Sequence, residues 1–212
     1  MKIQYINPYV FRIEEYLPQE VFQYLEDYCR TCQFSLISNK KDFFCSIQKI
    51  WKHNNPSDFD QMYEVLKDSI EKLKWVSERI FSTNLFINPM FWLMKLQKNN
   101  FMWIHRDLHS TVQWVFHFQD TEEHQGWALY LEGLKNNEFK IFPRKNSIVV
   151  FHSSTAHRIW EYFWDVPRYS MQISMSSKES YESHIKLLQD EQLYEKIERR
   201  VLFEQDKHKI IK

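Results

Sequence analysis

The sequence predicts an α+β protein in one domain, with helices first, a β-rich core after them and a helical tail at the end. Three observations support this prediction. Apolar residues keep helical spacing in the first part of the chain, short aromatic and β-branched runs separated by polar turns follow, and charged helical sequence comes last. A chain of 212 residues is also long enough for one substantial core. We expect helical support over 1–90, a β core over 91–176 and a tail over 177–212.

The first 90 residues predict one strand and two helices. Residues 1–16 mix apolar and polar side chains and suit a first strand that adds to the main sheet. A helix should begin near Pro18, because proline is tolerated at the first helical positions. The break at 54–56 precedes a longer helix, with Ser57 as its expected cap and an apolar stripe that ends near residue 81. We expect this stripe to cover the outer face of the sheet that follows.

The three cysteines lie in this first part of the chain, at Cys29, Cys32 and Cys45. Cys29 and Cys32 have the Cys-x-x-Cys spacing of zinc and redox sites. Both are nevertheless in register with the apolar face of the first helix, and a second such pair is missing. Small buried hydrophobic residues are therefore the better interpretation. Three cysteines cannot all pair within one chain, and this number suits a reducing compartment.

Eight short runs predict the strands of the β-rich part. This number suits a double-stranded β-helix, the jelly-roll arrangement of cupins and their relatives. The expected strands are 91–97, 102–107, 111–119, 126–132, 138–142, 147–152, 156–162 and 168–175.

The tail from residue 177 is helical and strongly charged, with apolar residues scattered among Lys, Glu and Arg. A solvated helix packed on the barrel and a homodimer contact both fit this partial apolar stripe. The 28 basic and 28 acidic residues balance, which argues against a broad nucleic-acid or membrane footprint. We find neither a secretory signal nor a stretch with the apolar length of a membrane span, so we expect a cytoplasmic protein.

The side chains that could bind a metal or take part in catalysis lie in the predicted β core. His105 and Asp107 are two positions apart on a predicted strand, so their side chains share one face. His157, from a distant strand, would complete two imidazoles and one carboxylate around a metal and leave other coordination positions open. Non-haem Fe(II) oxygenases prefer such a site. Arg168 and Ser170 share a face of the last predicted strand, and a guanidinium suits a carboxylate ligand.

The ordered set of His105-x-Asp107, His157 and Arg168 resembles the 2-oxoglutarate/Fe(II)-dependent oxygenases, with a prolyl-4-hydroxylase-like order of parts. The resemblance implies the same jelly-roll fold and an Fe(II) ion held by His105, Asp107 and His157. It also implies that 2-oxoglutarate chelates the iron and places its distal carboxylate against Arg168 and Ser170. With dioxygen, such enzymes release succinate and CO2, so the implied activity is hydroxylation of an aliphatic carbon in a small molecule or a side chain.

Two departures from the family pattern argue against a peptidyl-prolyl substrate. Leu96 stands where relatives often have a tyrosine nine residues before the His-x-Asp pair, and Gln125-Gly126 replaces their Gly-Gly pair. Related halogenases have a small residue in place of the carboxylate, so Asp107 favours hydroxylation or another oxidation. The alternatives are a non-catalytic cupin-like module that binds a metal or ligand, and a zinc-dependent cupin-type isomerase or hydrolase.

Strand alternation predicts further residues of the pocket. Trp103 shares a predicted face with His105. The run 113–118 alternates two kinds of side chain, and we expect its Gln113 and His117 face to line the pocket and its aromatic face to pack beneath helices. The candidate substrate contacts are Trp103, Gln113, His117 and Trp127.

Overall fold

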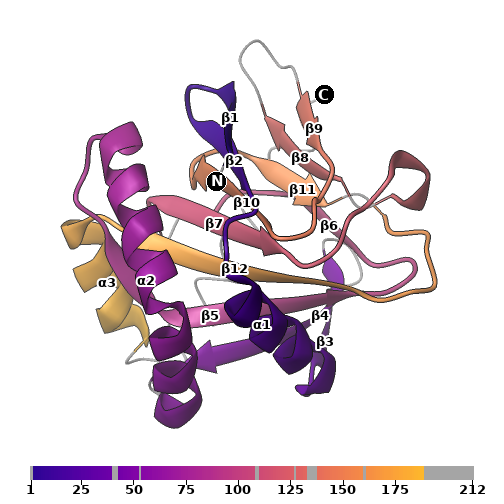
Figure 1. Cartoon of the computed structure of the whole chain (residues 1–212), viewed down its shortest axis with the longest axis horizontal. Helices are drawn as coiled ribbons and strands as arrows, with labels where there is room; N and C mark the ends of the chain where they lie inside the picture. Colours follow the sequence, from indigo (N-terminus) through magenta and orange to yellow (C-terminus); the bar gives the residue numbers. More distant parts are fainter. Residues whose placement is uncertain are drawn as a thin grey trace.

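The computed structural model describes residues 2–39, 43–52, 54–107, 110–126, 128–132, 138–159 and 161–188. Within these ranges the chain forms three α-helices, one 3-10 helix and twelve strands (Figure 1). The helices are α1 (Gln19–Thr31), α2 (Pro56–Phe81), α3 (Lys178–Leu188) and the 3-10 helix η1 (Glu123–Gln125). The strands are β1 (Lys2–Asn7), β2 (Val10–Glu14), β3 (Ser35–Asn39), β4 (Phe43–Trp51), β5 (Phe86–Leu96), β6 (Phe101–His105), β7 (Val112–His117), β8 (Leu129–Glu132), β9 (Glu138–Ile141), β10 (Ser147–His152), β11 (His157–Ile159) and β12 (Arg168–Ser176).

The eight strands predicted for the β core are all present, as β5 to β12, and the two predicted helices before them are α1 and α2. The first part of the chain differs more from the prediction. Residues 1–16 contain two strands, β1 and β2, which pair as a hairpin, and the strands β3 and β4 were not predicted at all. Asn55 rather than Ser57 is the N-cap of α2, because Pro56 takes the first helical position, where a missing N–H is tolerated.

The strands form one continuous antiparallel sheet in the order β1-β2-β10-β7-β12-β5-β4-β6-β11-β8-β9, with β3 paired to β4. Strand β4 pairs with β6 at its start and with β5 over the rest, so it joins the two halves of the sheet. Side chains of β10 in one half and of β8 and β11 in the other half meet in one buried apolar cluster. The sheet therefore turns back on itself into a jelly-roll barrel with this cluster inside (Figure 1).

The outer face of the barrel wall packs against α1 and α2, as Figure 1 shows. Trp114 of β7 and Ile173 of β12 are fully buried there, together with Leu25 of α1 and Leu66 of α2. The Trp114 indole N–H also donates to the Ser77 hydroxyl of α2 at 3.1 Å. The structure thus confirms that the stripe of α2 covers the sheet and that the aromatic face of 113–118 lies beneath helices.

The tail begins with α3, where Tyr181 lies 5.6 Å from Phe86 of β5 between ring centroids. Residues 189–212 lie outside the described ranges, so the predicted dimer contact stays a prediction. Of the helices in the described ranges, none combines the length and the apolar character that crossing a bilayer requires.

The three cysteines are free thiols. Cys29 lies in the cluster between helices and sheet, and Cys45 lies in the cluster inside the barrel. Burial raises the pKa of Cys45 to about 11, so its thiolate is disfavoured.

Candidate metal centre

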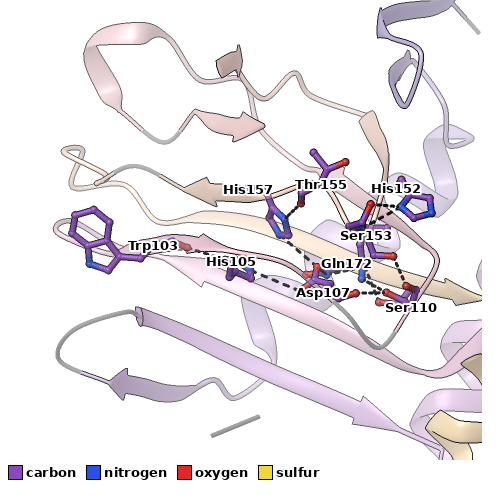
Figure 2. Close-up of polar contacts among 12 residues, drawn as sticks. Trp103, His105, Asp107, Ser110, His152, Ser153, Thr155, His157 and Gln172 are labelled. Carbon is purple, nitrogen blue, oxygen red and sulfur yellow. Dashed lines mark hydrogen bonds and ion pairs between the residues drawn. The ribbon is translucent and has the colours of Figure 1, made fainter. Parts of the chain in front are cut away.

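Three potential ligand side chains converge inside the barrel. His105 ends β6, Asp107 follows it, and His157 begins β11 directly opposite His105. Nε2 of His157 lies 3.4 Å from Oδ2 of Asp107, and Nε2 of His105 lies 3.8 Å from Oδ1 of the same carboxylate. One ligand atom of each residue lies within 4.8 Å of the other two, so a single ion could contact all three (Figure 2).

Backbone carbonyls fix both imidazole rings. Nδ1 of His105 lies 2.8 Å from the Trp103 carbonyl oxygen, and Nδ1 of His157 lies 3.1 Å from that of Thr155. Because a carbonyl only accepts, each Nδ1 carries the proton and each Nε2 presents its lone pair toward Asp107. Burial, followed by the neighbouring His105, lowers the pKa of His157 to about 4. His157 is therefore neutral near pH 7, as a metal ligand must be.

A β-bulge in β6 brings His105 to the inside of the barrel. His157 pairs with His105, but Ile159, two residues further along β11, pairs with Met102, three residues back along β6. The extra residue interrupts the alternation of side chains. Met102 packs against the inner cluster, whereas Trp103 is 41% exposed. The alternation that predicted a shared face for Trp103 and His105 is thus interrupted, and the carbonyl of Trp103 makes the contact with His105 (Figure 2).

Arg168, at the start of β12, is a buried cation, only 8% exposed. Its Nε donates to the Tyr162 hydroxyl at 3.1 Å and its Nη2 donates to Oε1 of Gln125 at 2.9 Å. Within the described residues, both hydrogen bonds of this guanidinium go to uncharged oxygens. A buried cation is costly without an anion, so Arg168 suits a ligand that brings a carboxylate into the barrel.

Gln125 and Tyr162 reach Arg168 because a β-bridge joins Gly126 to Tyr162. Gly126 has φ of 77°, and a Cβ at this position would collide with the carbonyl oxygen of Glu161. Glycine alone permits this approach. Sequence reasoning noticed Gln125-Gly126 as a departure from the family pattern but missed the contact of Gln125 with Arg168, and it missed Tyr162 altogether. No local signal marks either contact, because both depend on how two loops meet.

The inner face of β12 continues from Arg168 through Ser170 to Gln172. Ser170 is 2% exposed and directly opposite His117 of β7. Burial, and then the charge of Arg12, lowers the pKa of His117 to about 3. The structure places the predicted Ser170 and His117 on the same inner surface as the three potential ligands.

Gln113 also lies on this inner surface, 1% exposed, where its Oε1 accepts a hydrogen bond from Nε2 of Gln172 at 2.8 Å. Sequence reasoning missed Gln172, although it shares the strand face of Arg168 and Ser170, so alternation could have found it. Trp127 lies outside the described residues. Substrate contacts by Gln113, His117, Trp103 and Trp127 stay predictions.

The arginine next to His157 points away from the site, as alternation predicts. Arg158 donates to a Glu138 carboxylate oxygen at 2.7 Å and lies over the ring of Tyr130 at 4.8 Å. Of these two arginines, Arg168 is therefore the one that points into the barrel.

Comparison of the sequence with protein-family models finds no match, and comparison with curated proteins finds none. Solved structures do match. A prolyl hydroxylase from Trichoplax adhaerens, in complex with a hypoxia inducible factor oxygen degradation domain peptide fragment, has a TM-score of 0.68 at 13% identity, over 83% of this chain and 87% of that one. A Pseudomonas putida prolyl-4-hydroxylase has a TM-score of 0.63 at 15% identity, over 80% and 92%. The α-ketoglutarate-dependent epimerase SnoN from nogalamycin biosynthesis has a TM-score of 0.63 at 11% identity, over 79% and 77%.

The chain therefore has the fold of the 2-oxoglutarate/Fe(II) oxygenases, and prolyl hydroxylases are among the structures it resembles. This agrees with the resemblance seen in the order of the motif residues. Identities of this size establish the fold, so the chemistry has to be argued from the site itself.

Proposed function

We propose that this protein is an Fe(II)- and 2-oxoglutarate-dependent dioxygenase that hydroxylates an aliphatic carbon of a small molecule or of a side chain. The observation that carries the proposal is the pairing of two features on one inner surface. His105, Asp107 and His157 offer ligand atoms to one ion, and the buried cation Arg168 lies on the wall of the same barrel. Two imidazoles and one carboxylate are the donor set that Fe(II) oxygenases use.

The residues of the chain fit this metal and cosubstrate. His105 and His157 would bind iron through Nε2, since their Nδ1 atoms are held by carbonyls, and Asp107 would supply the carboxylate. Iron(II) would supply the oxygen activation that couples decarboxylation of 2-oxoglutarate to oxidation of a substrate carbon. Arg168 would bind the distal carboxylate of the cosubstrate with two of its planar donors. Ser170, on the same strand face, would add a hydroxyl.

An apolar wall lies beside His157 inside the barrel. The ring of Phe151 packs against His157 with centroids 4.9 Å apart, and Leu131 of β8 and Val149 of β10 are fully buried in the inner cluster. An apolar wall beside a metal site favours the oxidation of bound substrate over side reactions with solvent.

Similar structures include enzymes with other outcomes, namely the SnoN epimerase and the carbocyclase SnoK. The fold alone therefore does not choose the reaction. Asp107 keeps the carboxylate position occupied, which favours hydroxylation or another oxidation over halogenation. Mass analysis of the oxidised product would decide between insertion of oxygen and another oxidation.

The experiment is an anaerobic titration with Fe(II) and 2-oxoglutarate, followed by exposure to oxygen. We expect a visible charge-transfer band, oxygen consumption and succinate release with the intact protein. His105→Ala should abolish all three. His124→Ala is the matched control, because this histidine on η1 has an exposed side chain and is not one of the three potential ligands. A cupin-like binding module would bind metal without releasing succinate, and that result would overturn the proposal.

A further inference from the structure

A closed ring of hydrogen bonds begins and ends on Asp107. Nε2 of Gln172 donates to Oδ2 of Asp107 at 3.0 Å and to Oε1 of Gln113 at 2.8 Å. Nε2 of Gln113 donates to the Ser110 hydroxyl, which donates in turn to the backbone carbonyl of Asp107 at 3.3 Å. Figure 2 shows Gln172, Asp107 and Ser110 side by side. The ring ties the side chain and the main chain of Asp107 to β7 and β12.

The donors and acceptors in this ring determine which end of each glutamine amide faces which neighbour. Asp107 and the Oε1 of Gln113 can only accept, so both protons of the Gln172 amide are used and its NH2 end must face Asp107. Gln113 cannot turn over either, because its NH2 group would then face the NH2 group of Gln172. Its Oε1 also accepts a hydrogen bond from the Ser174 hydroxyl at 2.7 Å. Gln113 is 1% exposed, so water does not compete for the hydrogen bonds of its amide. The Gln172 amide is thus set in place before any ligand arrives.

We propose that Gln172 is the positioning residue for Asp107 in metal binding, with Gln113 as its support. The amide holds the carboxylate in one rotamer, and its proton would make Oδ2 a weaker donor to a metal than Oδ1. The backbone N–H of Asp107 donates to the Ser153 carbonyl oxygen at 3.2 Å, which fixes the peptide group of the ligand as well. This inference rests on the proposed metal function and deepens it.

The test uses Co(II) as a spectroscopic probe of the metal site, with the full chain and no cosubstrate. Partners of a metal ligand typically change affinity about 10- to 100-fold when they are removed. We expect Gln172→Leu to weaken Co(II) binding by that factor, and Gln172→Met to do the same with a more flexible side chain. The metal-free proteins should melt close to the intact one, because Gln113 keeps its hydrogen bond from Ser174.

The ring makes a second measurement possible, a double-mutant cycle. Gln113→Leu leaves the bond between Gln172 and Asp107 in place and should weaken Co(II) binding less than Gln172→Leu does. The double variant should lose less affinity than the sum of the two single losses, because Gln113 acts on the Asp107 side chain through the Gln172 amide. If the two losses of Co(II) affinity were additive, Gln113 would not act through Gln172, and its supporting role would be overturned.

Gln23→Leu is the matched control. Gln23 on α1 donates its Nε2 to Oδ1 of Asp27 at 3.0 Å, so this variant removes the same kind of amide-to-carboxylate bond at an exposed position. Its Co(II) affinity should equal that of the intact protein. Unchanged Co(II) affinity in Gln172→Leu would overturn the proposal. So would a loss of affinity in both Gln172 variants that appears only together with a large drop in the melting temperature of the metal-free protein.

Failure of this proposal can be told apart from failure of the proposed function. If Gln172 has no positioning role but the protein is an oxygenase, Gln172→Leu binds Co(II) normally and the Fe(II) form releases succinate. If the protein binds metal but is not an oxygenase, Gln172→Leu loses Co(II) affinity and even the intact Fe(II) form releases no succinate.

Discussion

The two faces of β7 and β12 differ sharply in what they contact. The outer face carries Trp114 and Ile173, which are fully buried between the sheet and the helices. The inner face carries Gln113, Gln172 and Arg168, whose hydrogen bonds go to other polar side chains inside the barrel. The same two strands therefore provide a stabilising apolar layer on one side and a polar inner surface on the other.

This difference implies that the two faces respond to mutation in opposite ways. Truncating an apolar outer residue removes buried contacts and destabilises the fold. Replacing a charged inner residue removes a group that is costly to bury, so it should affect ligand binding more than stability. Four substitutions, ordered by expected effect, measure this contrast.

Trp114→Ala should have the largest effect. The indole is fully buried and bonded to Ser77, so we expect the free energy of unfolding to fall by about 3–5 kcal/mol in urea. Trp75→Ala is the control, because Trp75 on α2 is 56% exposed and lies against Arg79, and its loss should cost less than about 1 kcal/mol. Similar losses in the two variants would contradict the role given to the outer face.

Arg168→Met should weaken 2-oxoglutarate binding by about 2–5 kcal/mol, because a buried charge pair loses one partner. Calorimetry on the Co(II) form under anaerobic conditions measures this. The free energy of unfolding of the ligand-free protein should stay the same or rise, since the cation is buried against uncharged oxygens. Arg158→Met, which removes an outward-facing guanidinium, should leave 2-oxoglutarate affinity unchanged. Equal losses of 2-oxoglutarate affinity in both variants would show that Arg168 does not bind the cosubstrate.

His117 should give the metal-free protein a pH-dependent stability. In the unfolded chain this histidine takes up a proton near its ordinary pKa of 6.5, whereas in the folded protein its pKa is about 3. The unfolded state thus binds the proton first, and stability falls as the pH drops from about 6.5 toward 3, by up to about 1.4 kcal/mol per pH unit for one proton.

Urea unfolding at several pH values measures this slope. His117→Asn should reduce this slope by the contribution of one proton over the interval. His157 contributes in the same direction, since its pKa is also lowered. An unchanged slope in His117→Asn would show that His117 is protonated in the folded protein.

Trp103→Ala should have the smallest effect on the folded protein. Trp103 is 41% exposed and contacts His105 through its carbonyl, which the substitution keeps. We expect a change in unfolding free energy within about 0.5 kcal/mol and an unchanged Co(II) affinity. A loss of metal affinity would mean that the indole itself supports His105.

Strand alternation explains why much of the site could be predicted from sequence. It assigned Gln113 and His117 to the inside of the barrel and Trp114 to the helix side, and the structure confirms this. It also predicted that the side chain of Arg158 points to the face of the strand opposite to that of His157. Alternation works here because successive side chains of a regular strand point to opposite faces, whatever the rest of the fold does.

Alternation was interrupted at β6, where the bulge places Met102 and His105 on the inside and leaves Trp103 exposed. A bulge is a property of two paired strands, and one strand alone does not reveal it. The strands β3 and β4 were missed for a related reason, since the prediction assigned the whole of 1–90 to helical support and one strand.

The sequence by itself determined the eight strands of the β core, the side chains able to bind a metal, and the faces of the regular strands, because these depend on residue type and local backbone geometry. Only the tertiary structure decided that Gln172 and Gln113 form a ring with Asp107 and that Gln125 and Tyr162 flank Arg168. Those contacts depend on the register between segments far apart in the chain, which local patterns do not encode.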